Sequence, residues 1–115
     1  MRRLLLVLLL PLPALALSSA AQEFMAISAQ LEPVQCEKRQ LRRQMAMAQA
    51  ENRADDMNRL RGRVAQINRD KQTARLEQRL AQLEKRISDG KGGTRDPQDL
   101  DAISAQQRQA FYRCE

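Results

Sequence analysis

The sequence predicts an all-α fold, an elongated antiparallel helical hairpin or coiled coil followed by a short C-terminal third helix. The chain has 115 residues, which is enough for one small domain. Between Cys36 and Ile87 there is no Pro and only one Gly, and apolar residues recur at steps of three and four, as on one face of a helix. Aromatic residues make up 3% of the chain, and there are four Gly and four Pro. This composition excludes a compact core built on aromatic rings and a sandwich or barrel with many turns.

Residues 1–21 form the first element, which we predict to be a cleavable signal peptide. A positive start, a wholly apolar stretch and a run of small residues follow one another at Arg2–Arg3, 4–10 and 14–21. This order is typical of export signals. The apolar stretch is far shorter than the ~20 residues that span a bilayer. We therefore expect a periplasmic protein, cleaved near Ala21, with no transmembrane span in its mature chain. Cleavage after Ala20 or Ala16 is an alternative.

A mixed leader is expected over 22–35, with Pro33 suited to the first turn of the helix that follows it. The helical hairpin or coiled coil is expected over 36–88, and its first helix over 36–67. Two apolar stripes at helical spacing indicate helices in this region. They are Met57, Leu60, Val64 and Ile67, then Leu76, Leu80, Leu83 and Ile87. The stripes do not share one heptad frame, and residues 68–73 between them include Asn, Asp and Thr, which favour caps and turns. We predict a break there, and one uninterrupted helix is the alternative.

The chain then turns through a Gly-rich loop over 89–96 and enters a C-terminal helix over 97–115. Asp96 is expected to cap this helix, with Pro97 at its first position. We expect Asp99 in its first turn, where a carboxylate is stabilised by the positive end of the helix dipole.

Cys36 and Cys114 are predicted to form one disulfide, because two cysteines in a small exported domain most simply pair. Helices over 36–67, 73–88 and 97–114 are expected, so the first would be about 48 Å long and the other two together about 51 Å. If the last two stack end to end, antiparallel to the first, Cys114 returns to Cys36. If the C-terminal helix instead folds back on the second, the cysteines lie apart. An intermolecular bridge, and with it a homodimer, then becomes the expectation.

Two segments of the chain carry a recognisable pattern, the first at Cys36, Lys38, Gln44-Met45, Ala48-Gln49, Asn52, Arg59-Leu60 and Gly62, and the second over 80–87. With these residues the chain resembles the YqjC-like family of small periplasmic helical proteins of unknown function, and the segment 80–87 is similar to a later coiled-coil helix of that family. The family's second Cys lies near its hairpin turn, whereas Cys114 stands at the far end of this chain. The resemblance implies a location and a shape, with no catalytic residues.

The residue types indicate a non-catalytic protein with no cofactor. The chain contains no His, which removes the commonest general base and metal ligand. It also contains no Gly-rich phosphate loop, and its close carboxylate pairs do not converge on one helix face. Four methionines offer thioether ligands of the kind that suit monovalent copper, namely Met25, Met45, Met47 and Met57. Because positions i and i+2 face different sides of a helix, we interpret them as packing residues and predict no metal site.

An excess of positive charge points to an anionic partner, because residues 37–86 hold 14 Lys+Arg and seven acidic residues. The candidate anion-binding residues are Arg39, Arg42, Arg43, Arg59, Arg61 and Arg63. A solvated helix face balanced by ion pairs is the alternative interpretation. Because export argues against nucleic acid, we expect an envelope protein or an anionic envelope surface as partner. The sequence thus predicts a non-catalytic protein-binding module for assembly or stress. The alternative is a binder of phospholipid or lipopolysaccharide phosphates.

Overall fold

The computed structural model describes residues 17–89 and 96–114, and within them it contains four helices and no strand. They are α1 (Ser19–Ala50), α2 (Ala54–Asn68), α3 (Lys71–Asp89) and α4 (Pro97–Arg113). The predicted all-α class is confirmed. The molecule measures 73 × 39 × 25 Å with a radius of gyration of 19.7 Å, against about 13 Å for a compact domain of this length. Predicted signal-peptide residues 1–16, loop residues 90–95 and Glu115 lie outside the described residues.

Helix α1 is longer than expected, and the prediction of a separate leader over 22–35 is wrong. The helix begins at Ser19, so Pro33 lies inside it and not at its start. Three buried side chains at helical spacing explain the extension, because Phe24, Ile27 and Leu31 pack against α3 and α4. Pro33 removes one backbone hydrogen bond from the helix. Burial of this apolar face offsets the lost hydrogen bond. Local sequence signals do not reveal that burial, because the partners lie on distant helices.

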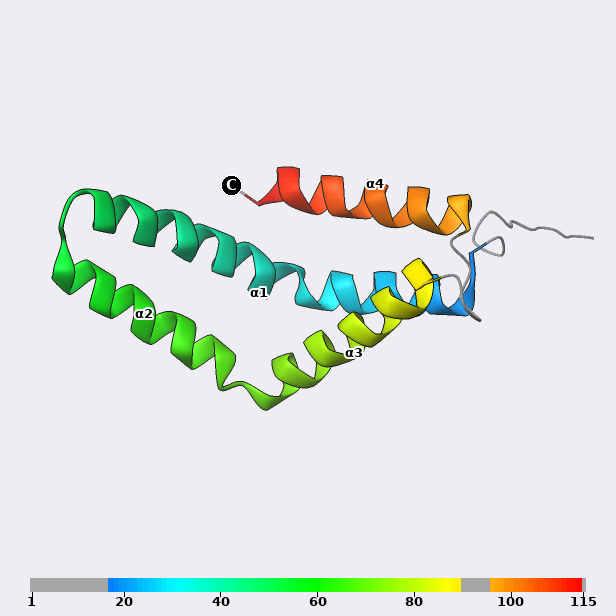
Figure 1. Ribbon diagram of the computed structural model, residues 1–115, viewed down its shortest axis with the longest axis horizontal. Coiled ribbons are helices and arrows are strands. Elements are labelled where there is room, and N and C mark those ends of the chain that lie inside the picture. Colours follow the sequence, from blue (N-terminus) through cyan, green and yellow to red (C-terminus); the bar gives the residue numbers. More distant parts are fainter. Residues whose placement is uncertain (1–16, 90–95, 115) are drawn as a thin grey trace, which may run out of the picture.

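A tight turn at Glu51–Arg53 separates α1 from α2 and makes them an antiparallel hairpin (Figure 1). The expectation of one helix over 36–67 is therefore wrong. Asn52 adopts a left-handed conformation with φ 56°, and Asn tolerates this region better than most residues. The Asn52 amide donates to the Gln49 carbonyl at 3.2 Å, and the Arg53 amide donates to the Ala48 carbonyl at 2.8 Å. This is the Schellman pattern of a helix end, formed here without glycine.

The predicted break at 68–73 is confirmed, since α2 ends at Asn68 and α3 begins at Lys71. Asp70 caps α3, because its Oδ1 accepts from the backbone amides of Gln72 at 3.0 Å and Thr73 at 3.4 Å. Asp96 caps α4 as predicted, with its side chain accepting from the Gln98 amide at 2.8 Å. Short polar side chains thus marked the starts of α3 and α4.

The buried apolar residues form two separate clusters along α1. The hairpin core joins the second half of α1 to α2 through Leu41, Ala48, Leu60 and Ile67. The bundle core joins the first half of α1 to α3 and α4 through Ala21, Phe24, Ile27, Leu31, Leu83, Ile87 and Ile103. Burying a leucine such as Leu31 or Leu83 contributes about 1.5–3 kcal/mol. The described part of the molecule is therefore a three-helix bundle at one end and a two-helix hairpin at the other.

Helix α4 runs parallel to the first half of α1, and this arrangement corrects the expected disulfide geometry. In Figure 1, α4 turns back from the end of α3 and lies along α1. The fold-back was expected to separate the cysteines. They meet because α1 continues upstream to Ser19. The segment from Ser19 to Cys36 and the whole of α4 are each about 26 Å long by helical rise, so the end of α4 reaches Cys36.

Candidate functional site

Three polar contacts and a disulfide hold α4 against α1. Each polar contact joins residues 81 apart in sequence, at Ser18–Asp99, Met25–Gln106 and Glu32–Arg113. The contacts therefore recur every seven residues on both helices, as expected for parallel helices in register. Beyond the last contact, Cys36 and Cys114 are bonded, with Cα atoms 5.5 Å apart and a sequence separation of 78.

The contact nearest the disulfide is a bidentate ion pair between Arg113 and Glu32. The Arg113 guanidinium donates to both oxygens of Glu32, at 2.9 and 2.8 Å. These hydrogen bonds lower the pKa of the Glu32 carboxyl and raise the pKa of Arg113. Equivalent pairs join α1 to the other helices, Glu23 with Arg79 on α3 and Glu37 with Arg63 on α2. Each arginine lowers the pKa of its partner's carboxyl.

A groove of about 330 Å³ lies between α1 and α4, with α3 at its side. Its lining residues are Ser28, Glu32, Gln35, Arg39, Leu80, Gln106, Gln107, Ala110 and Phe111. The Gln106 side chain donates from Nε2 to the Met25 carbonyl at 2.8 Å. Its Oε1 is buried and has no hydrogen-bond partner in the described part of the chain. An unsatisfied buried acceptor is uncommon in folded proteins and calls for an explanation.

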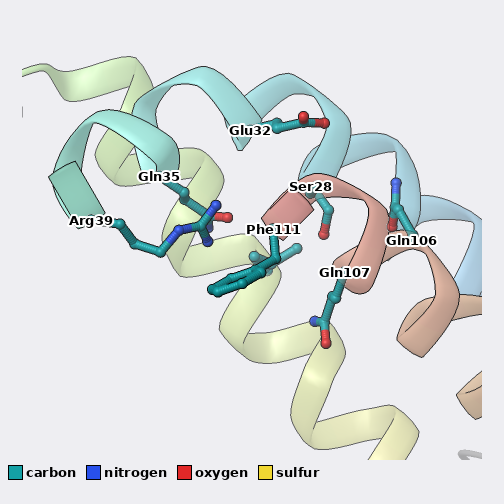
Figure 2. A pocket seen from close by; sticks show the side chains of 9 residues that line it. Ser28, Glu32, Gln35, Arg39, Gln106, Gln107 and Phe111 are labelled. Carbon is teal, nitrogen blue, oxygen red and sulfur yellow. The ribbon is translucent and has the colours of Figure 1, made fainter. Parts of the chain in front are cut away.

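An exposed aromatic pair lies near the end of α4, and one of its two rings, that of Phe111, lines the groove. Phe111 is 60% exposed and Tyr112 is 74% exposed, and their rings meet edge to face with centroids 5.8 Å apart. Figure 2 shows Arg39 and Phe111 directed toward one another across the groove, with the Arg39 Cζ 5.6 Å from the ring centroid. Sequence reasoning missed this site. Adjacent aromatic residues at the end of a polar helix, in a chain that is otherwise almost free of rings, were the available signal.

The six predicted anion-binding arginines do not share one surface. Arg59 and Arg63 lie beside Glu37 on one side of the hairpin, and Arg61 lies on the opposite side near Asn52. Arg63 is paired with Glu37, and Arg59 approaches Asp56 at 3.5 Å.

The α1 arginines lie apart from this pair. Arg39 and Arg42 line a small hollow with Lys38, and Lys38 is paired with Glu77 at 2.8 Å. Arg43 is exposed on the same helix. Among the described residues, no ion pair involves Arg42, Arg43 or Arg61.

The methionines are spread over both cores. Met25 packs against the bundle core, Met45 and Met57 pack against the hairpin core, and Met47 is 57% exposed. Within residues 17–89 and 96–114, no group of three or more His, Cys, Asp or Glu side chains is placed to hold a metal ion. No helix in these ranges is long and apolar enough to cross a membrane.

Comparisons of this chain with protein-family models, curated proteins and solved structures find no match. The resemblance to the YqjC-like family therefore stays a prediction.

Proposed function

We propose that this chain is an exported, non-catalytic protein-binding module, for assembly or stress in the periplasm, that captures a polypeptide segment in the groove between α1 and α4. The single observation that carries the proposal is the groove itself. The Gln106 side chain, whose buried Oε1 has no hydrogen-bond partner among the described residues, lines the same groove as the exposed ring of Phe111.

The chemistry of the groove suits a peptide. Gln106 Oε1 is buried in the free protein, so a peptide N–H would reach it only after the Gln106 amide turns toward the groove. That hydrogen bond would remove the cost of about 1–3 kcal/mol that an unpaired buried acceptor carries. The amides of Gln35 and Gln107 offer both donors and acceptors to further peptide groups. Phe111 offers an apolar face to a partner side chain, and aromatic anchors of this kind contribute strongly to protein interfaces.

The charged lining of the groove favours binding over catalysis. The Glu32 carboxylate is held by Arg113, which lowers its pKa and keeps it ionised near neutral pH. A general acid or base instead needs a pKa near the operating pH. Arg39 is occupied by its contact with the Phe111 ring. The Glu32–Arg113 pair and the Arg39–Phe111 contact hold the walls of the groove in place. Both therefore support binding of a partner.

Export is part of the same proposal. The order of charged, apolar and small residues over 1–21 supports it. The Cys36–Cys114 disulfide is compatible with it, because disulfides persist in oxidising compartments and are rare in the cytosol.

A photo-crosslinking amino acid at Gln107 tests the proposal in cells. We expect it to yield discrete adducts with an envelope polypeptide, and the same probe at Ala65, exposed on α2, to yield none. Phe111→Ser should abolish the adducts. Tyr112→Ser, which removes the neighbouring exposed ring outside the groove lining, should preserve them. Equal adducts from all variants, or none from Gln107, would contradict the proposal.

A second candidate is binding to an anionic envelope surface, favoured by the cations of α1. Arg42 and Arg43 have no ion pair among the described residues and lie on the helix that carries Lys38 and Arg39. Binding to phosphatidylglycerol vesicles should weaken steeply with salt, because exposed charge contacts are screened. Arg42→Gln with Arg43→Gln should reduce it more than Arg59→Gln with Arg61→Gln. Binding that does not change with salt would exclude this candidate.

A further inference from the structure

Leu17 and Ser18, the two residues just before α1, make contacts with the rest of the fold. The Ser18 backbone amide donates to Asp99 Oδ1 at 3.0 Å, and the Ser18 hydroxyl donates to Asp99 Oδ2 at 2.7 Å. The same hydroxyl oxygen accepts from the Ala21 amide at 3.1 Å and so caps α1. Asp99 is 0% exposed. One serine therefore starts α1 and binds a buried carboxylate on α4.

The next residues are buried with it. Ala21 is 0% exposed and belongs to the bundle core, and Leu17 and Ala20 pack against that core. The Leu17 carbonyl accepts from the Gln22 side chain at 3.0 Å. The segment from Leu17 to Ala21 is thus the first turn of the bundle, although the sequence marks it as the cleavage zone of an export signal.

The sequence alone offers three cleavage points, after Ala16, Ala20 or Ala21. Each has small residues one and three positions upstream, as a signal-peptide cleavage site requires. The last two would remove Ser18, with its cap on α1 and both hydrogen bonds to Asp99. The first, preceded by Ala14-Leu15-Ala16, leaves every one of these contacts in the mature chain.

We infer that signal peptidase hydrolyses the Ala16–Leu17 bond, so that mature α1 keeps its Ser18 cap. The inference rests on the proposed export. Water adds across the peptide bond and leaves a carboxylate on Ala16 and an α-ammonium group on Leu17. A positive group is unfavourable at the start of a helix. Here it stands one residue before the Ser18 amide that donates to Asp99 Oδ1, and that hydrogen bond and the Ser18 cap are both kept.

N-terminal sequencing and intact mass of the exported chain, both under denaturing conditions, test this inference. A start at Leu17 is the expected result. A start at Ala21 or Gln22 would overturn the inference and leave the proposed export intact. A chain that still begins at Met1 and is confined to the cytoplasmic fraction would overturn the inference and the proposed export together.

A matched pair of variants locates the cleaved bond. Ala16→Phe places a large residue directly before the proposed bond, and we expect the precursor to accumulate at least tenfold. Ser19→Phe places the same residue three positions before the Ala21–Gln22 bond, at an exposed site, and we expect processing to stay at Leu17. Accumulation of precursor with Ser19→Phe, and normal processing with Ala16→Phe, would overturn the inference.

Discussion

Removing the Cys36–Cys114 bridge should destabilise this protein more than most single changes. For the loop of 78 residues that it closes, the chain-entropy model gives about 4.5 kcal/mol at 25 °C as an upper figure. Native disulfides in small secreted domains contribute about 2–5 kcal/mol. We therefore expect the Cys36→Ala, Cys114→Ala double variant to lose about 2–4.5 kcal/mol of unfolding free energy.

The loss should be greatest in α4, because apart from the disulfide only three polar contacts with α1 and two buried side chains hold that helix. Asp99 and Ile103 are its buried residues, and Leu100, Phe111 and Tyr112 are exposed. The hairpin core of α1 and α2 does not include any α4 residue. Amide exchange in the double variant should accelerate first in α4 and least in α2.

Urea unfolding followed by far-ultraviolet circular dichroism measures the free energy, with a reductant as the matched control. Reductant should lower the stability of the native protein to that of the double variant and should leave the variant unchanged. A difference of less than about 1 kcal/mol between oxidised protein and variant would refute the reasoning, because native disulfides in small secreted domains contribute about 2–5 kcal/mol. Equal acceleration of amide exchange in α2 and α4 would also refute the reasoning.

Three further predictions concern charge and backbone. The pKa values of Glu23, Glu32 and Glu37 are lowered by their arginine partners, so these pairs stabilise the fold above the ordinary carboxyl pKa. The melting temperature should fall as the pH drops below about 4.3. Changing Glu23, Glu32 and Glu37 to Gln should make this dependence on pH shallower. An unchanged dependence would contradict the role given to these three ion pairs. Gly62→Ala should raise unfolding free energy by about 1 kcal/mol in urea titration, because Gly62 lies within α2 and an added methyl group would meet no atom within 4 Å. Asn52→Val should cost about 1–2 kcal/mol and Asn52→Gly should not, since the residue adopts φ 56°; equal stabilities would argue against the left-handed turn.

Local sequence signals predicted much of the fold, because helix propensity and caps act over a few residues. The steps of three and four predicted the stripes on α2 and α3, and Leu60, Ile67, Leu83 and Ile87 are buried as those stripes imply. Asp96 with Pro97 predicted the start of α4. The Asn52 turn was missed because Asn is a weaker signal than Gly for a left-handed residue.

The candidate groove could not be predicted, because its walls come from segments about 80 residues apart. Gln106 and Phe111 are ordinary polar and aromatic residues of an amphipathic helix until α4 lies parallel to α1. The separation of Arg61 from Arg59 and Arg63 is different, because positions i and i+2 face different sides of any helix, and the sequence therefore already carried that signal.

The sequence by itself determined where α4 begins, that this chain is helical and breaks within 68–73, and that its two cysteines suit a bridge. Those properties depend on backbone propensity, short polar caps and composition, which act locally. Only the tertiary structure decided that α1 starts at Ser19, that Pro33 lies within it, and that α4 runs parallel to it. These outcomes depend on burial of Phe24, Ile27 and Leu31 against distant helices, and the free energy of that burial exceeds the local preferences that pointed elsewhere.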